Sequence, residues 1–528
     1  MRAMGPRSLR SLAVAVLLAP ALTLSALPAP AASAPVLPRE VAAAAVVSPR
    51  LVSASRTSLT LDWADVSGAS GYRVRYSTHA NFRSARSVTV ATSRVTLKGL
   101  KAVTKYYVVV QPLAAIGSVA AAASPRLTFK TMATAAPIGL WARASARSAD
   151  TVAVNWLFTT AGRHYQVQYS ANPDFSAAAI VTTTVASTVI GGLTTGQPYY
   201  FRVRSLTARG SVTSGWSGAV TATPQVPADP GAAPLEVGSF NIRNWQRSKG
   251  GSWGVRGPLV ADAIASRHLD VVGLQEADFH LRDGVSQYGS LINLLAARGG
   301  SYQAVEAGTT AGTRIIYNAA TVSLARTGMR QLPSIRGDVN RYVVWAEFVQ
   351  NSNGRHFIFA NTHLVPETHP VATKKCSAKQ SKRYKMRVTQ AALVMDEIQA
   401  NAAGRPLVLV GDMNSHKVQC PTNAPYRTYV SRGLIDPLGN PDRSKRPVRP
   451  TTEVRIHSEW DTSNHYSRKP IRHNIVNGHH VDYVFVSPSV TTLTYEIVVK
   501  INDATLKYIG RHPSDHNLVR AQILIPPS

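Results

Sequence analysis

The sequence predicts a multidomain protein in which two all-β sandwich modules precede one α/β domain. The chain has 528 residues, which is more than one hydrophobic core usually organises, because single domains mostly run to about 100–200 residues. Its N-terminal part repeats itself at a fixed offset of 93 residues, with the two-residue alternation of β-strands. Beyond residue 234, apolar strand-like runs such as LDVVGL and PLVLVG alternate with helical spacings.

Residues 1–34 are typical of an export signal. Three arginines supply a basic start, the run from Leu12 to Leu27 is apolar, and small residues at 29–34 offer a cleavage site. A membrane anchor is the weaker interpretation, because prolines bracket the run and it is shorter than the roughly 20 apolar residues that a span needs. We therefore expect a secreted, extracellular protein without a transmembrane segment.

The internal repeat aligns large apolar residues. The aligned pairs are Trp63/Trp156, Tyr72/Tyr165, Tyr76/Tyr169, Phe82/Phe175, Leu100/Leu193 and Tyr106/Tyr199. Short runs such as YRVRYS and YQVQYS alternate as strands do, with turn residues between them. Each copy is therefore predicted to be a β-sandwich, over about residues 48–132 and 136–224.

Both copies resemble fibronectin type III modules in their early Trp and their Tyr-x-Val-x-Tyr strand. A leucine six residues before Tyr106 or Tyr199 resembles the tyrosine corner of that family. Inward alternation accounts for the aromatic residues, so we interpret them as core rather than as a ligand site. The modules would be spacers or would bind an extracellular polysaccharide or cell-surface ligand. The Pro- and Ala-rich stretch 225–234 predicts a semi-rigid linker to a domain at 235–528.

Polar residues recur at the ends of the apolar runs in this last domain. They are Asn241, Glu276, Asn361, His363, Asp412 and Asn414. Asp482 begins one run, and Ser514-Asp515-His516 precedes the last, so antiparallel neighbours would bring both to the same edge. There a metal and a substrate could reach them. Singly, each residue also fits a turn, a helix cap or a satisfied strand end.

Six motifs in order resemble the endonuclease/exonuclease/phosphatase family over nearly all of 235–527. They are SFNIRN, LQEAD, NTHL, GDMNS, DYVFVS and PSDHN. The FNIR string, together with a histidine in NTHL, resembles the deoxyribonuclease branch. The resemblance implies an α/β (α+β) sandwich of two mixed β-sheets flanked by helices, and a Mg²⁺-dependent phosphodiesterase, with Mn²⁺ and Ca²⁺ as open alternatives.

The same resemblance implies a metal site. Glu276 would be the principal Mg²⁺ ligand, with Asn241 and Asp515 close to the ion. All three are oxygen donors of the kind that Mg²⁺ prefers.

The resemblance also assigns catalytic roles. His516 would be a general base or phosphate ligand oriented by Asp482, and His363 the acid on the leaving-group side. Asp412 and Asn414 would position the attacking water and hold the phosphate. The sequence identifies no glutamate partner for His363.

A basic segment follows the NTHL run. Between residues 374 and 387, seven of fourteen residues are basic: Lys374, Lys375, Lys379, Lys382, Arg383, Lys385 and Arg387. A polyanion such as nucleic acid would be attracted there, and the formal net charge of +30 favours the same partner. The alternative is a solvated charge run.

The two cysteines, Cys376 and Cys420, are predicted to pair, because an exported protein meets oxidising conditions. The pair would tie the basic segment to the catalytic edge. Two free thiols are the alternative.

Three functions remain open: an extracellular nuclease, a sphingomyelinase-like or inositol-phosphate phosphodiesterase or phosphatase, and a non-catalytic surface adhesin. The intact motif set argues against the adhesin. The sequence contains no apparent exposed apolar hairpin for membrane contact, which favours the nuclease. DNA against RNA and endo against exo cleavage stay open. We expect a monomer in which residues 1–234 are dispensable for turnover, because every catalytic candidate lies beyond the linker.

Overall fold

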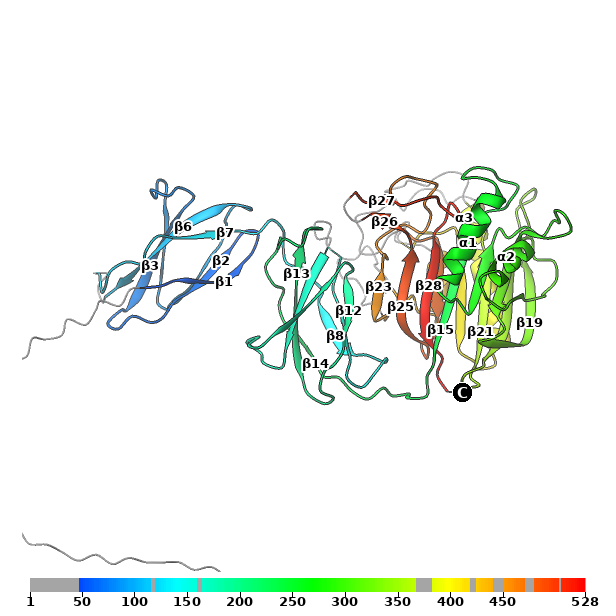
Figure 1. Cartoon of the computed structure of the whole chain (residues 1–528), viewed down its shortest axis with the longest axis horizontal. Helices are drawn as coiled ribbons and strands as arrows, with labels where there is room; N and C mark the ends of the chain where they lie inside the picture. The colour runs from blue at the N-terminus through cyan, green and yellow to red at the C-terminus, as the bar shows by residue number, and fades with distance from the viewer. Residues whose placement is uncertain are drawn as a thin grey trace, which may run out of the picture.

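The computed structural model describes residues 47–114, 119–158, 164–366, 382–417, 424–439, 451–470, 479–502 and 505–527. Two β-sandwiches and a larger two-sheet domain follow one another along the chain (Figure 1). The predicted export signal and both cysteines lie outside the described residues. Within the described part of the chain, no helix has the length and apolar character needed to cross a bilayer.

The first module packs a three-stranded sheet, β1-β2-β5, against a four-stranded sheet, β4-β3-β6-β7. The strands are β1 (Arg50–Ala54), β2 (Leu59–Asp62), β3 (Gly71–Ser77), β4 (Arg86–Val90), β5 (Arg94–Leu97), β6 (Lys105–Leu113) and β7 (Leu127–Lys130). The buried Trp63 ring contacts Tyr72 edge-on, with ring centroids 5.2 Å apart. The Tyr106 hydroxyl accepts a hydrogen bond from the amide of Lys101 at 2.9 Å, as the predicted tyrosine corner requires.

The second module repeats this arrangement with sheets β8-β9-β12 and β11-β10-β13-β14. Its strands are β8 (Trp141–Ala144), β9 (Val152–Asn155), β10 (His164–Ser170), β11 (Ala179–Thr183), β12 (Ser187–Ile190), β13 (Tyr199–Leu206) and β14 (Val220–Ala222). Trp156 and Tyr165 are again 5.2 Å apart, and the Tyr199 hydroxyl accepts from the amide of Thr194 at 3.2 Å. The Trp, Leu and Tyr pairs that recur in the sequence are therefore equivalent positions of the two cores. The expectation of a core role is wrong for Phe82 and Phe175, which are partly exposed and lie under the guanidinium groups of Arg75 and Arg202.

The C-terminal domain is a sandwich of two mixed sheets. The seven-stranded sheet comprises, in spatial order, β17 (Tyr302–Ala304), β18 (Arg314–Asn318), β16 (Val271–Gln275), β15 (Pro234–Asn241), β28 (Leu518–Leu524), β25 (Thr491–Val498) and β23 (Val454–Ile456). The five-stranded sheet comprises β19 (Val322–Leu332), β20 (Arg341–Gln350), β21 (His356–His363), β22 (Leu407–Asp412) and β24 (Asp482–Val486). A short hairpin, β26 (Ile501–Asn502) and β27 (Lys507–Tyr508), precedes β28.

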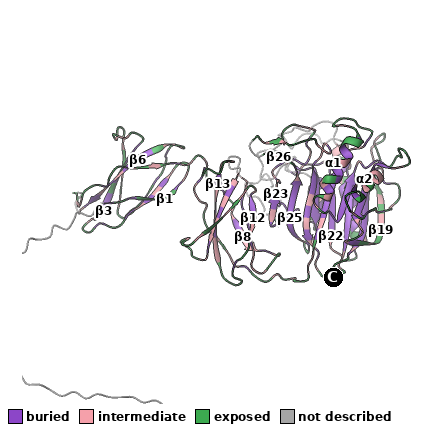
Figure 2. Ribbon diagram, viewed as in Figure 1, coloured by how far each residue is buried: buried purple, intermediate pink, exposed green. Residues whose placement is uncertain are grey.

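Helices cover the outer faces of both sheets, as predicted. The helices are α1 (Trp253–Ala265), α2 (Gln287–Ala296), α3 (Lys382–Ala402) and α4 (Ala424–Ser431). Apolar residues of α1 and α2 join those of β15, β16 and β18 in one cluster, whereas α3 and α4 cluster with β20, β21, β22 and β24. A third cluster fills the space between the sheets, and Figure 2 shows that both sheets are mostly buried.

The two sheets approach closely near their centres. A Cβ atom on Gly273 would lie 2.4 Å from the side chain of Val410 on the facing sheet, so this position requires glycine. Next to it, the fully buried Asn361 donates to the carbonyl groups of Leu274 (2.9 Å) and Arg314 (2.7 Å). The expectation that Asn361 belongs to the functional edge is therefore wrong: its amide links the two sheets.

Candidate functional site

Strand pairing brings the predicted polar residues to one edge of the sandwich. β15 and β16 run parallel and end side by side at Asn241 and Gln275. β21 and β22 are also parallel, with His363 opposite Asp412. β24 is antiparallel to β22, so Asp482 at its start lies opposite Asp412.

The backbone turns sharply where these strands end. Arg243, Glu276 and Asn414 have φ angles of 54°, 55° and 45°, in the left-handed region that non-glycine residues seldom occupy. Such conformations persist where the surrounding structure enforces them, often at functional sites. In the GDMNS motif, a Cβ atom on Gly411 would lie 2.1 Å from the carbonyl oxygen of Thr362, so glycine is required for this close approach.

A histidine, His516, lies between two aspartates. Its Nδ1 atom is 2.8 Å from Oδ2 of Asp482, and its Nε2 atom is 3.9 Å from Oδ2 of Asp412. The predicted Asp482–His516 pair is therefore formed in the structure. His363 approaches Asp412 from the other side, with Nε2 3.6 Å from Oδ2, so an aspartate rather than a glutamate is the acidic neighbour of this histidine.

Burial and charge shift the titration of this cluster in opposite directions. Burial lowers the pKa of His516, but the charges of Asp482 and Asp412 outweigh it and raise the pKa to about 10. Burial, followed by the charge of Asp482, raises the pKa of Asp412 to about 7. Burial and then the charge of Arg341 hold the pKa of His363 well below its usual range. At neutral pH this arrangement holds His516 charged and His363 neutral.

The oxygen atoms at this edge suit a hard divalent cation. Glu276 accepts hydrogen bonds from the Asn241 side chain at 3.3 Å and the Asn244 amide at 3.2 Å, and Asn241 also donates to Asp412 at 3.1 Å. Oδ1 of Asp482 is buried, and no hydrogen-bond donor reaches it among the described residues. Buried carboxylates without enough positive charge fit a site for a cation. Asp412, Asp482 and His516 also place ligand atoms within 4.8 Å of one another, but a charged His516 ring has no lone pair for a metal and is itself the cation between these two carboxylates.

Asp515 lies differently from the expectation. Its carboxylate forms an ion pair with Arg243 and accepts a hydrogen bond from the Ser514 hydroxyl at 3.2 Å. The structure therefore brings Asn241 and Glu276 together as predicted. The Asp515 carboxylate is instead paired with the guanidinium of Arg243.

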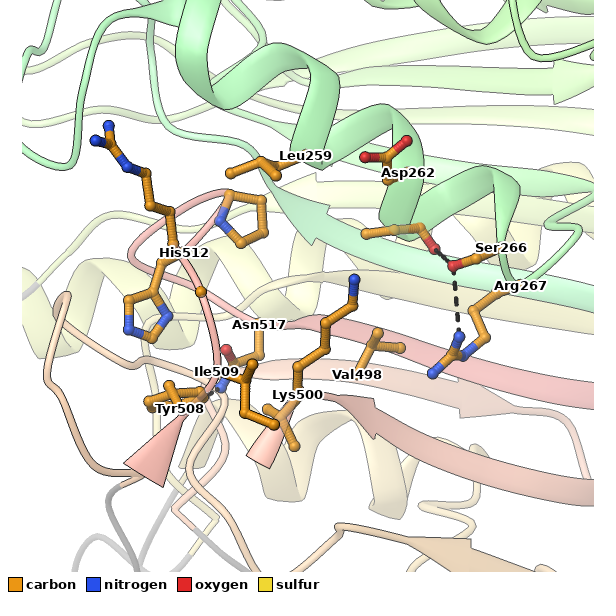
Figure 3. A pocket seen from close by; sticks show the side chains of 15 residues that line it. Leu259, Asp262, Ser266, Arg267, Val498, Lys500, Tyr508, Ile509, His512 and Asn517 are labelled. Atoms are coloured by element: carbon orange, nitrogen blue, oxygen red, sulfur yellow. Dashed lines mark hydrogen bonds between the residues drawn. The ribbon is translucent and has the colours of Figure 1, made fainter. Parts of the chain in front are cut away.

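A cavity of about 450 Å³ opens over these groups. Its lining includes Glu276, Arg341, His363, Asp412, Asn414 and His516. Asn414 is fixed at its floor, because its side-chain amide donates to the carbonyl of Leu364 at 3.0 Å. A second hollow, of about 90 Å³, lies between α1 and the β26–β27 hairpin and is lined by Lys500 and His512 (Figure 3). Of the predicted catalytic and metal residues, Glu276, His363, Asp412, Asn414 and His516 line the first cavity, whereas Asn241, Asp482 and Asp515 are not in its described lining. None of the eight is in the described lining of the second.

Arg341 is a site residue that the motifs did not identify. It opens β20, which pairs with the strand ending at His363, and it lines the cavity. Burial lowers the pKa of its guanidinium, while Asp412 and Glu276 act in the opposite direction. Its Nε is buried and has no hydrogen-bond partner within the described ranges. The only signal in the sequence is an arginine that opens the antiparallel partner of the NTHL strand.

The basic segment is only partly a surface feature. Lys374, Lys375 and Lys379 lie outside the described residues, and α3 begins at Lys382. Phosphate contact is the wrong role for Arg387, because its side chain is buried and Nη1 donates to the carbonyl of Val365 at 3.3 Å. Arg383 pairs with Asp338 at 2.7 Å. Lys382 and Lys385 are exposed.

Comparisons with known proteins agree with this geometry. The model of the endonuclease/exonuclease/phosphatase family matches residues 238–516, and the fibronectin type III model matches residues 45–129. The assignment of the second module to the fibronectin type III family remains a prediction that rests on the internal repeat. No curated protein shows significant similarity to the chain.

Three solved structures match 55% to 56% of this chain and nearly all of their own length. An endonuclease/exonuclease/phosphatase family protein from Bacteroides thetaiotaomicron is 23% identical, with a TM-score of 0.42, over 56% of this chain and 99% of the other. A mannosyl-6-phosphatase from the same organism is 24% identical, with a TM-score of 0.41, over 55% and 99%. The human Nocturnin catalytic domain with bound sulfate is 16% identical, with a TM-score of 0.38, over 56% and 95%. Similarities at this level identify neither substrate nor activity.

Proposed function

Because the chain belongs to the endonuclease/exonuclease/phosphatase family, whose members hydrolyse phosphoester bonds, we propose that it is a secreted, Mg²⁺-dependent phosphodiesterase that cleaves nucleic acid. The observation that carries the proposal is the Asp482–His516 pair, 2.8 Å apart, beside Asp412 in the cavity that Glu276 and Arg341 also line. These are the groups that an in-line displacement at phosphorus needs in one place.

The charges suggest how the protein side chains divide the work. Asp482 fixes Nδ1 of His516, so Nε2 of the charged ring is available to donate to a phosphate oxygen and stabilise its developing charge. Asp412, whose pKa is raised to about 7, is suited to accept a proton from the attacking water. A divalent cation bound at Glu276 and Asn241 would polarise a phosphate oxygen. The role of phosphate ligand is thus favoured for His516 over that of general base.

His363 and Arg341 would act on the same phosphate. A histidine with a lowered pKa is neutral, so His363 is suited to donate a hydrogen bond rather than to act as a strong acid. Arg341 supplies a fixed positive charge. Its Nε donates no hydrogen bond to any described residue, so it is available to a phosphate oxygen. An incoming phosphate would also raise the pKa of His363, which makes proton donation to the leaving group easier.

An aromatic pair at the mouth of the cavity supports nucleic acid as the substrate. Phe279 and His280 stack with ring centroids 4.3 Å apart and planes 27° from parallel, and both line the cavity. Phe279 is 36% exposed, and His280 is held by Asp278 at 2.7 Å. A rigid, exposed aromatic surface beside a phosphate site is suited to stacking a nucleobase.

A base-stacking role can be separated from phosphate chemistry with two substrates. Phe279→Ala should raise the KM for an oligonucleotide by roughly 5- to 160-fold, because stacking is worth about 1–3 kcal/mol per base. It should leave hydrolysis of an abasic oligonucleotide with the same backbone unchanged, and Phe279→Trp should restore the loss. Ile509→Ala, which removes an exposed apolar side chain at the second hollow, is the control. Equal effects on both substrates, or preferential hydrolysis of sphingomyelin vesicles by the wild type, would contradict the assignment.

A further inference from the structure

The second sandwich module packs directly against the edge of the catalytic domain, in addition to being joined to it by the linker. β23, the last strand of the seven-stranded sheet, lies against β12 of the module. Its central residue, Arg455, is buried, and its guanidinium enters the module. There Nε donates to the side chain of Asn155 at 3.2 Å, and Nη2 donates to the carbonyl groups of Trp156 at 2.5 Å and Ala186 at 3.1 Å.

A buried carboxylate makes the reciprocal contact. Glu453 accepts hydrogen bonds from the Ser145 hydroxyl at 2.8 Å and the Ala146 amide at 2.6 Å, and it pairs with Arg147 at 3.2 Å. Asn155 joins both contacts, because its Nδ2 donates to the Glu453 carbonyl at 2.8 Å. Arg455 and Glu453, two charged residues of the catalytic domain, are thus both bound by polar groups of the module. Separation of the module would break all of these hydrogen bonds, so they favour the docked arrangement.

The chain leaves β23 and runs directly to the catalytic pair. Six positions after Ile456, the Thr462 hydroxyl accepts hydrogen bonds from the amides of Val481 at 3.0 Å and Asp482 at 3.2 Å. Asn464 then donates through its backbone amide to the carbonyl of Asp515 at 2.7 Å. The segment from β23 to Asn464 therefore holds the backbone on both sides of the Asp482–His516 contact.

Further bonds make this segment stiff. The Asp461 side chain accepts from the amide of His479 at 2.7 Å, and the Asn464 side chain donates to the carbonyl of Ser514 at 3.1 Å. The Thr462 carbonyl accepts from the amide of Asn517 at 2.7 Å. A displacement of β23 would therefore be transmitted along the segment to Asn464.

We propose that the second module is a positioning element of the catalytic site, and that it acts through Arg455 and Glu453 on the segment that aligns Asp482 with His516. The module is then a structural part of the enzyme, and Asn155 and Thr462 are positioning residues that need not touch the substrate. Misplacement of a catalytic group by about 1 Å can lower turnover by on the order of 100-fold.

The test uses the full-length chain and rests on the proposed phosphodiesterase function. Asn155→Ala removes the residue that bonds both the Arg455 guanidinium and the Glu453 backbone carbonyl, and it should lower kcat on bis(p-nitrophenyl) phosphate by about 10- to 100-fold with little change in KM. Thr462→Val should show the same split between kcat and KM, and Thr462→Ser should restore turnover. Gln168→Ala is the matched control. Gln168 accepts a hydrogen bond from Arg202 within the four-stranded sheet of the same module, whereas Asn155 lies in the three-stranded sheet. The control should leave kcat unchanged.

Hydrogen exchange supplies a readout that needs no activity. The amide of Asp482 should exchange at least tenfold faster in Asn155→Ala than in wild type, while the amides of β16 in the same domain keep their protection. Faster exchange throughout the domain would mean unfolding; in that case Arg147→Met, a change at the partly exposed margin of the interface, should give a smaller loss of kcat in a folded protein. Wild-type kcat with unchanged exchange in Asn155→Ala would overturn the inference. An inactive wild type with this exchange pattern would contradict only the proposed function.

Discussion

At the scale of single residues, the site combines groups whose charges depend on one another. Asp412 lies within 4 Å of both His363 and His516, and Asp482 contacts His516. A substitution at one of them therefore changes the charge of the others as well as removing its own contact. Glu276, which lines the cavity, is joined to this cluster through the Asn241 amide, which donates to both Glu276 and Asp412.

The catalytic and metal-binding roles can be distinguished by whether added metal restores the activity of a variant. His516→Ala should lower turnover by a factor on the order of 10² to 10⁴ without changing the apparent metal affinity, because it removes a group needed in the transition state. Asp482→Asn should give a milder defect. Glu276→Gln should weaken Mg²⁺ binding and lower activity, and high metal should restore part of that activity. Steady-state rates across a metal titration measure all three. Near-normal turnover of a folded His516→Ala protein would reject the assignment of this motif.

The raised pKa of His516 predicts how stability depends on pH. Its pKa is about 10 in the folded protein and near 6.5 when unfolded, so its stabilising contribution is complete below pH 6.5 and is lost as pH rises through 10. The buried His363 and His480 have lowered pKa values and act in the opposite direction, but only below about pH 6.5. In chelator, the free energy of unfolding measured with urea should therefore fall between pH 7 and 10. His516→Ala should flatten this fall. A wild-type curve that stays level would contradict the charge assignment.

At the scale of elements, the sequence predicted which site residues lie at strand ends. It predicted less well which side chains of different elements contact one another. Glu276, His363, Asp412 and Asp482 were identifiable because each adjoins an apolar run, and paired strands bring such ends together. The roles of Asn361 and Asp515 were not identifiable, because each is decided by a partner distant in the sequence: the facing sheet for Asn361 and Arg243 for Asp515.

The start of α3 gives a prediction about salt. Lys382 and Lys385 are exposed, whereas Arg383 is paired with Asp338. The double variant Lys382→Gln/Lys385→Gln should reduce the slope of log affinity for DNA against log salt by about 2, since each phosphate contact contributes roughly 0.9. Filter binding in chelator measures this slope without cleavage. An unchanged slope would identify these lysines as a solvated surface. Met329→Gln, at an exposed side chain of β19, is the control.

At the scale of the whole molecule, the fold class and module order follow from the repeat and the motifs, but the docking does not. Arg455 lies in a short strand that no motif marks, and its partners lie about 270 to 300 residues earlier. The linker is also held, because Asp229 pairs with Arg355 on the catalytic domain. This arrangement revises the expectation that residues 1–234 are dispensable: we expect removal of the second module to impair turnover.

The pairing of Cys376 with Cys420 remains a prediction, because both lie outside the described residues. A bond between them would close a loop whose entropy cost in the unfolded chain corresponds to about 4 kcal/mol of stabilisation. Mass spectrometry of the protein produced under oxidising conditions and alkylated without reduction should find one cross-linked peptide pair and no alkylated cysteine. Two alkylated thiols would show that the pairing is wrong.

The central claim is that one metal-dependent cavity hydrolyses phosphodiester bonds of nucleic acid. The most direct measurement incubates the full-length protein with plasmid DNA, RNA or sphingomyelin vesicles, each with Mg²⁺ and with chelator, beside His516→Ala. We predict that the wild type cleaves nucleic acid with Mg²⁺, that chelator abolishes cleavage, and that His516→Ala loses it by at least 100-fold. Cleavage of nucleic acid that persists in chelator or in His516→Ala, or hydrolysis of the vesicles alone, would contradict the account.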